Sequence, residues 1–163
     1  EQYLRYPQMA AVSSLVRSGI IGEPSYLYLS SAHEYHAFSL MRGLLGIPCS
    51  MPFSVKAQTF EYPSVLTNSR YEEFRDGRTA VMSRTAAVFR FENGAQLIFE
   101  TSWSFNGPIN NSTQVAGEKA GITLEPFKLY RADGEKLITE DIEGDFKGDI
   151  FASFLAILVR NSL

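Results

Sequence analysis

The residue types most able to do chemistry gather in one short stretch of the chain. His33 and His36 are its two histidines, and Glu34 lies between them. Imidazole titrates near neutral pH, so a histidine can take a hydroxyl proton as a general base. A buried histidine that is hydrogen-bonded to backbone would give the same pattern. We treat His36 as the candidate catalytic residue and keep the structural role as the alternative.

Five further residues are candidates for contacting a small-molecule substrate. His33 is expected at the end of a strand, in the wall of a pocket, and Glu34 beside it is a candidate carboxylate partner. Tyr35 and Arg5 are long polar side chains that can reach a substrate, although solvated surface positions explain them equally well. Trp103 ends a predicted strand, where it can line the mouth of a pocket or pack in the core.

Two predicted helices and one strand must position these residues. Apolar residues recur at helical spacing over residues 7–18, with Pro7 at the first helical position and Gly19 as the left-handed cap. Residues 25–31 alternate as in a strand, and residues 35–45 form an amphipathic helix. His36 is therefore predicted at a strand-to-helix junction, where α/β enzymes commonly place catalytic groups.

The later part of the chain is predicted to be mostly strands joined by hairpin turns. Asn93-Gly94 predicts a tight turn between strands at 87–92 and 95–103. Residues 62–80 are polar and irregular and are predicted to be a long loop. Further strands are expected at 53–59, 112–118, 121–125, 127–132 and 136–142, with a turn at Asp133-Gly134 and a last apolar helix at 149–160.

The fold class that these elements predict is α+β. Hairpin turns make most strand pairs antiparallel, while the early strand-helix alternation adds a mixed element. We expect an open mixed, mostly antiparallel sheet with helices packed on one face. The other face must then be solvated or covered by something else.

Composition and charge limit the class of protein. The 163 residues suffice for one domain, and 45% hydrophobic with 20% charged residues is typical of a globular chain. A net charge of −3 argues against a nucleic-acid partner. No apolar run approaches the roughly 20 residues of a membrane-spanning helix, so no membrane partner is expected. The single Cys49 excludes an intramolecular disulfide and favours a reducing, cytoplasmic compartment.

The sequence contains no complete catalytic or cofactor-binding motif. It has no Gly-rich dinucleotide fingerprint, no phosphate-binding loop and no metal-ligand spacing. No residue is therefore assigned to a cofactor or a metal. The chain begins at Glu1 rather than at methionine, and we expect it to be a piece of a longer protein.

Six stretches nevertheless follow one another in a recognisable order. They are Arg5-Tyr6-Pro7, Ser18–Glu23, His36 with Leu40–Gly46, Phe91–Ala95, Glu100–Trp103 and Val115–Gly121. This ordered set, which extends over nearly all 163 residues, resembles the C-terminal domain of the glucose–fructose oxidoreductase / inositol dehydrogenase (Gfo/Idh/MocA) family.

The resemblance implies that residues 1–163 form a substrate-binding and oligomerisation domain. The Rossmann domain that binds NAD or NADP in such proteins is absent from this chain, so the fragment alone is expected to be inactive. The intact protein would oxidise a sugar, polyol or related hydroxy compound, with His36 at the position of the family's base. The sheet face would form a homo-oligomer.

Two positions depart from the family's pattern. Family members often carry an aspartate four residues before the histidine and another three residues after it, where this chain has Ala32 and Ser39. The first aspartate normally helps to hold the substrate and tune the base. The alternative is therefore a non-catalytic binding or assembly module on the same sheet scaffold.

Overall fold

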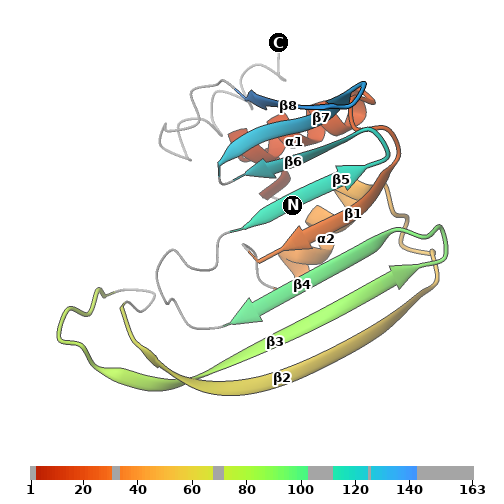
Figure 1. The fold of residues 1–163 in the computed structure, drawn as a ribbon. Helices are drawn as coiled ribbons and strands as arrows, with labels where there is room; N and C mark the ends of the chain where they lie inside the picture. The colour runs from red at the N-terminus through yellow and green to blue at the C-terminus, as the bar shows by residue number, and fades with distance from the viewer. Residues whose placement is uncertain (1–2, 31–33, 68–71, 103–111, 125, 143–163) are drawn as a thin grey trace, which may run out of the picture.

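The computed structural model describes residues 3–30, 34–67, 72–102, 112–124 and 126–142 (Figure 1). A 3-10 helix, η1 (Tyr3–Arg5), precedes the helices α1 (Pro7–Arg17) and α2 (Glu34–Leu45). The strands are β1 (Pro24–Leu29), β2 (Phe53–Val65), β3 (Thr79–Phe91), β4 (Gln96–Ser102), β5 (Thr113–Gly117), β6 (Ala120–Leu124), β7 (Phe127–Asp133) and β8 (Lys136–Asp141).

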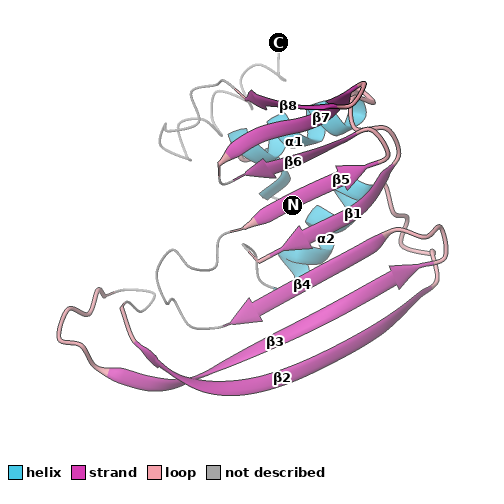
Figure 2. Cartoon of the chain, viewed as in Figure 1, coloured by secondary structure: helices cyan, strands magenta, loops and turns pink. Residues whose placement is uncertain are grey.

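The strands form one open 8-stranded sheet in the order β2-β3-β4-β1-β5-β6-β7-β8. β1 and β4 are parallel, and the other neighbouring strands are antiparallel. Both α-helices lie on the same face of the sheet (Figure 2). The α+β fold with a mixed, mostly antiparallel sheet is thus confirmed. Within the described ranges, no helix is long and apolar enough to cross a membrane.

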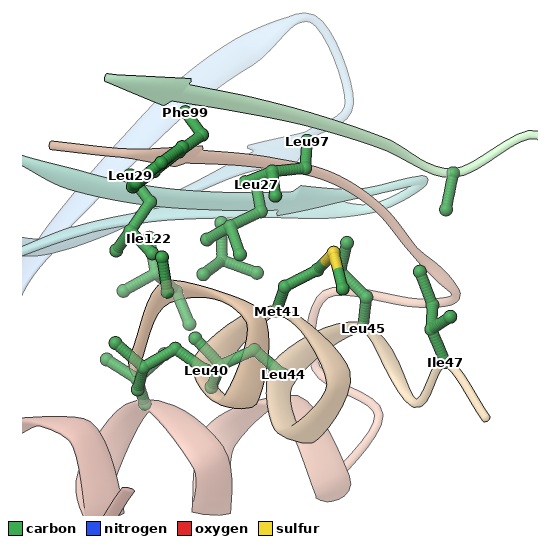
Figure 3. Close-up of a cluster of buried hydrophobic side chains, with 14 of the residues drawn as sticks. Leu27, Leu29, Leu40, Met41, Leu44, Leu45, Ile47, Leu97, Phe99 and Ile122 are labelled. Carbon is green, nitrogen blue, oxygen red and sulfur yellow. The ribbon is translucent and has the colours of Figure 1, made fainter. Parts of the chain in front are cut away.

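The core lies between α2 and the middle strands of the sheet (Figure 3). Leu27 and Leu29 alternate with polar neighbours along β1, so both point to the helix side, where each is 0% exposed. Leu40 and Leu44 sit one turn apart on α2 and meet them from the other side, at 0% and 1% exposure. Burying each such leucine contributes about 1.5–3 kcal/mol, which fixes α2 and the residues at its start.

The predicted ends of α1 are confirmed. Pro7 is at the start of the helix, where its missing N–H is not needed. Gly19 has a φ of 77° and donates its N–H to the Val16 carbonyl at 3.1 Å, as a left-handed cap does.

The predicted long loop over residues 62–80 is wrong at both ends, since only 66–78 connect the two strands. β2 continues to Val65 and β3 begins at Thr79, so the two strands form a hairpin much longer than β4 (Figure 1). Pro63 is tolerated because β2 is an edge strand with a neighbour on one side only. Almost all of β2 is exposed, so the alternation of apolar and polar residues over 53–59 corresponds to no buried face in the described structure.

The hairpin at Asn93-Gly94 is confirmed, but its loop has three residues rather than two. Phe91 and Ala95 close the loop through a 2.9 Å bond from the Phe91 N–H to the Ala95 carbonyl. The three loop residues are 92–94, and Gly94 adopts the left-handed conformation that a three-residue loop needs, with a φ of 86°. The later strands fall where the pattern predicts them, whereas the predicted helix at 149–160 lies outside the described residues.

Two of the family-like stretches, far apart in sequence, meet in the fold. The turn between α1 and β1 packs against the end of β5, and the Lys119 N–H donates to the Ile21 carbonyl at 2.9 Å. A Cβ added at Gly117 would lie 2.4 Å from the carbonyl oxygen of Ile21 and 2.6 Å from that of Glu23. Only glycine permits this approach, which joins α1 and β1 to the middle of the sheet.

Candidate functional site

His36 lies in the first turn of α2, shortly after the end of β1, as predicted for a strand-to-helix junction. Its side chain is 8% exposed, so it is buried in the described structure. The imidazole contacts two tyrosine rings. The ring centre of Tyr3 is 4.4 Å from that of His36, and the ring centre of Tyr35 is 3.9 Å from it.

The other predicted site residues are placed as follows. Tyr35 is 67% exposed, so one part of its ring contacts His36 while much of it faces outward. Arg5 is exposed at the end of η1, which packs beside α2. α2 begins at Glu34, whose side chain lies outside the described part, as do His33 and Trp103. The structure therefore brings Tyr35 and His36 together and places Arg5 on a neighbouring element.

Two cavities lie beside α2. An open one of about 700 Å³ includes Tyr35, Phe38, Ser39 and Arg42 in its lining. A smaller one of about 230 Å³ lies between the end of α2 and strands β2 and β3, and its lining is mostly apolar. His36 is not in the described lining of these two cavities, and Tyr35 both lines the open cavity and contacts the His36 ring.

Polar groups beside the open cavity are few. Ser39 lines it at the position where the family often has its second aspartate, and a hydroxyl cannot supply a carboxylate's charge. Among the described residues Arg42 makes no ion pair, and its Nε donates to the Ile47 carbonyl at 3.4 Å. The described lining can thus offer an anionic or hydroxylated ligand the guanidinium of Arg42, the hydroxyls of Ser39 and Tyr35, and aromatic surface.

A second cluster of polar side chains lies on the face of the sheet opposite the helices. Arg84 pairs with Glu100 at 3.4 Å, and the Arg84 guanidinium lies 5.9 Å from the ring centre of Tyr62. Burial raises the pKa of Tyr28, and the charge of Glu100, to which the Tyr28 hydroxyl is hydrogen-bonded, raises this pKa further. This row of charged and aromatic groups crosses four adjacent strands, from β1 to β2.

The described residues do not fit a dinucleotide or a metal. A dinucleotide needs a glycine-rich turn between a strand and a helix, and residues 30–34, which join β1 to α2, contain no glycine. No group of three His, Cys, Asp or Glu side chains within the described ranges could hold a metal ion.

The aromatic contacts of His36 include one residue that sequence reasoning missed. Tyr3 is 33 positions away in sequence, and only the docking of η1 on α2 brings it to His36. A glycine inside the predicted helix, Gly43, was the available signal, because an interior glycine often marks a close packing contact.

Comparison with known proteins gives structural matches only. No protein-family model matches the chain, and no curated protein matches it. An NAD-binding oxidoreductase from Klebsiella pneumoniae superposes with a TM-score of 0.57 at 12% identity, over 96% of this chain and 54% of that one. An oxidoreductase from Agrobacterium radiobacter, in complex with NAD+, L-tartaric acid and magnesium, gives 0.56 at 15% identity, over 97% and 51%.

A third structure is an inositol dehydrogenase homologue from Azotobacter vinelandii in complex with NADH and myo-inositol. It gives a TM-score of 0.52 at 13% identity, over 94% of this chain and 48% of that one. The chain therefore spans about half the length of these structures. It has the fold of one part of NAD-binding oxidoreductases.

Proposed function

We propose that the chain is the substrate-binding half of an NAD(P)-dependent oxidoreductase of the Gfo/Idh/MocA family. The substrate would be a sugar, a polyol or a related hydroxy compound. The observation that carries the proposal is the shared fold over nearly the whole chain with oxidoreductases that bind NAD. The neighbour that holds myo-inositol supports a hydroxylated substrate.

In this proposal His36 is the general base. A ring nitrogen of a neutral imidazole accepts the proton of the substrate hydroxyl, and the burial of His36 keeps bulk water from competing for that nitrogen. NAD+ or NADP+, when bound, would supply the hydride acceptor. We assign its binding to sequence outside this chain, since residues 30–34 between β1 and α2 contain no glycine. Tyr35, with Arg5 nearby on η1, would contact the substrate, as would His33, Glu34 and Trp103.

The second candidate is a non-catalytic binding or assembly module. The low exposure of His36 beneath Tyr3 and Tyr35 favours it, since a base must reach its substrate. Ser39 in place of a carboxylate favours it as well. In this case the aromatic cluster is a packing feature, and the cavity beside α2 takes a ligand without chemistry.

We also propose that the protein forms a homo-oligomer through the open face of the sheet. Half-buried apolar and aromatic side chains lie in register there across three strands, with Tyr28 beside Ile98 and Ile98 beside Val88. No described helix covers this face (Figure 2). Sedimentation at micromolar concentration should show a dimer or larger species, and a monomer would contradict this part of the proposal.

The exposed thiol of Cys49 is consistent with a reducing compartment, and we propose the cytoplasm.

The decisive assay follows the reduction of NAD+ and NADP+ by the intact protein with a panel of sugars, polyols and hydroxy acids. The proposal predicts turnover with at least one hydroxy compound. It also predicts that calorimetric titration of this 163-residue chain detects no binding of either cofactor. Binding of a hydroxy compound without any turnover favours the module, and tight cofactor binding to this chain alone refutes the two-domain assignment.

A further inference from the structure

We propose that Tyr3 is a positioning residue for His36, and that a contact between Leu4 and Gly43 holds it in place. This inference rests on the proposed function, in which His36 is the base. The first observation is the ring contact itself, with 4.4 Å between the ring centres of Tyr3 and His36 and an angle of 41° between the ring planes.

The segment that carries Tyr3 is anchored at several points. The Tyr6 N–H donates to the Tyr3 carbonyl at 3.2 Å, which closes η1. The Tyr6 ring centre lies 4.9 Å from that of Tyr3. Tyr6 in turn caps the start of α1, so Tyr3 is tied to a helix whose Met9 and Val12 are buried in the core. The ring over His36 is therefore not the free end of a loose segment.

Leu4 fixes the same segment to α2. Its side chain lies against Gly43, where an added Cβ would come within 2.7 Å of Leu4 Cδ1 and 2.8 Å of Leu4 Cδ2. His36 and Gly43 are seven residues apart, so they lie on the same face of α2, about 10.5 Å apart along its axis. The adjacent residues Tyr3 and Leu4 thus contact α2 at His36 and at Gly43, two turns apart.

Gly43 lowers the stability of α2, and its contact with Leu4 explains why a glycine stands there. Glycine in a helix interior destabilises the helix by about 1 kcal/mol relative to alanine. An alanine at position 43 would force the Leu4 methyl carbons back by about 1 Å, because carbon atoms pack at about 3.5–4.0 Å. Leu4 is half-buried against the core, which limits how far its side chain can turn aside, so we expect part of this displacement to move η1 without breaking the core.

A displacement of that size matters for a base. Proton transfer needs the imidazole nitrogen within hydrogen-bond reach of the hydroxyl, and a misplacement of about 1 Å can lower the rate about 100-fold. The Tyr3 ring limits rotation of the imidazole about its Cβ–Cγ bond. Tyr3 itself takes no part in the proton transfer, so it acts through His36.

The test is NMR spectroscopy of the chain labelled in its histidine rings. The two histidines give two sets of ring signals, which His36→Gln assigns. Tyr3→Leu removes the ring current of Tyr3, while that of Tyr35 remains, and should shift the His36 signals. Tyr3→Phe keeps the ring and should preserve the His36 signals. Gly43→Ala should move the His36 signals in the direction of Tyr3→Leu.

Gly121→Ala is the matched control for Gly43→Ala. A Cβ at Gly121 meets only atoms at 3.7 Å and 3.9 Å, so the His36 signals should not change. His36 signals that are the same in the unmodified chain, Tyr3→Leu and Gly43→Ala would overturn the proposal. Should Tyr3→Leu fail to fold, Gly43→Ala decides alone.

Turnover of the intact protein gives the second readout. Tyr3→Leu should lower kcat about 10- to 100-fold with little change in the KM for substrate, and Tyr3→Phe should restore it. An unchanged kcat in Tyr3→Leu overturns the positioning role. An intact protein without NAD(P)-dependent turnover refutes the proposed function instead, and the histidine signals still decide whether Tyr3 orients His36.

Discussion

Replacing Gly117 by alanine should destabilise the fold through a backbone clash that side chains cannot relieve. The new Cβ would lie 2.4 Å and 2.6 Å from the carbonyl oxygens of Ile21 and Glu23, and real Cβ atoms essentially never come within 3.0 Å. Either β5 or the turn before β1 must move. Overpacking costs about 1–3 kcal/mol, and loss of the bond from the Lys119 N–H to the Ile21 carbonyl costs about 0.5–1.5 kcal/mol more.

A smaller effect opposes this loss. Alanine lowers the conformational entropy of the unfolded chain, which stabilises the folded state by about 0.4–1 kcal/mol. The net decrease in the free energy of unfolding is therefore about 2 kcal/mol. For a domain of this size, that loss lowers Tm by about 4–8 °C. Thermal and urea unfolding followed by circular dichroism measure it.

The control is Gly121→Ala on the neighbouring strand β6. Its Cβ has room, with the nearest atoms at 3.7 Å and 3.9 Å, so its stability should match or slightly exceed that of the unmodified chain. Equal stabilities of Gly117→Ala and Gly121→Ala would refute the close packing of the α1–β1 turn on β5. The pairing of the two family-like stretches would then be wrong.

Three other predictions concern the sheet, the core and the thiol. The raised pKa of Tyr28 means that the folded state holds its proton to higher pH than the unfolded state, so this contribution to stability is complete below about pH 10 and lost as the pH rises further. Tyr28→Phe and Glu100→Gln should each weaken the fall in the free energy of unfolding above pH 10, and an unchanged fall in both would contradict the assigned causes. Leu40→Ala, at a residue that is 0% exposed, should lower the free energy of unfolding by about 2–5 kcal/mol. Val81→Ala, at 70% exposure, should change it by no more than about 0.5 kcal/mol. Equal changes for the two variants in urea unfolding would contradict the packing of α2 on the sheet. Cys49 is exposed, so a thiol reagent should label one site per folded chain at the rate of a free thiol, and protection until unfolding would contradict its placement.

Local signals predicted the elements that bury one face. α2 shows apolar residues at helical spacing, and its Leu40 and Leu44 are indeed in the core. The hairpin around Gly94 follows from a turn sequence with few alternatives. These features depend on residues close together in the chain, so one sequence suffices to predict them.

The far part of the β2–β3 hairpin was missed because it buries almost nothing. Val65 and Val81 are 51% and 70% exposed, while Met82 is 4% exposed, so the apolar residues of this stretch do not follow the alternation of buried and exposed positions. Pro63 is compatible with this strand because β2 lies at the edge of the sheet. What stabilises this stretch is pairing with a neighbouring strand, which the sequence of β2 alone does not reveal.

The surroundings of the candidate base were missed for a different reason. Residue type and local context singled out His36, but its burial against Tyr3 comes from the docking of η1 on α2. That docking depends on a contact between Leu4 and a glycine almost forty residues further along the chain. Spacing along the sequence cannot show such a contact, which in our proposal holds Tyr3 against His36.

The turnover number of His36→Gln in the intact protein tests the central claim most directly. General acid–base catalysis contributes about 100- to 10,000-fold, so kcat should fall by that factor. The dissociation constants of NAD+ and NADP+ should not change, because in our proposal sequence outside this chain holds the cofactor. Undiminished kcat in an active protein would contradict the role of His36 as base and make the binding module the better account of this domain.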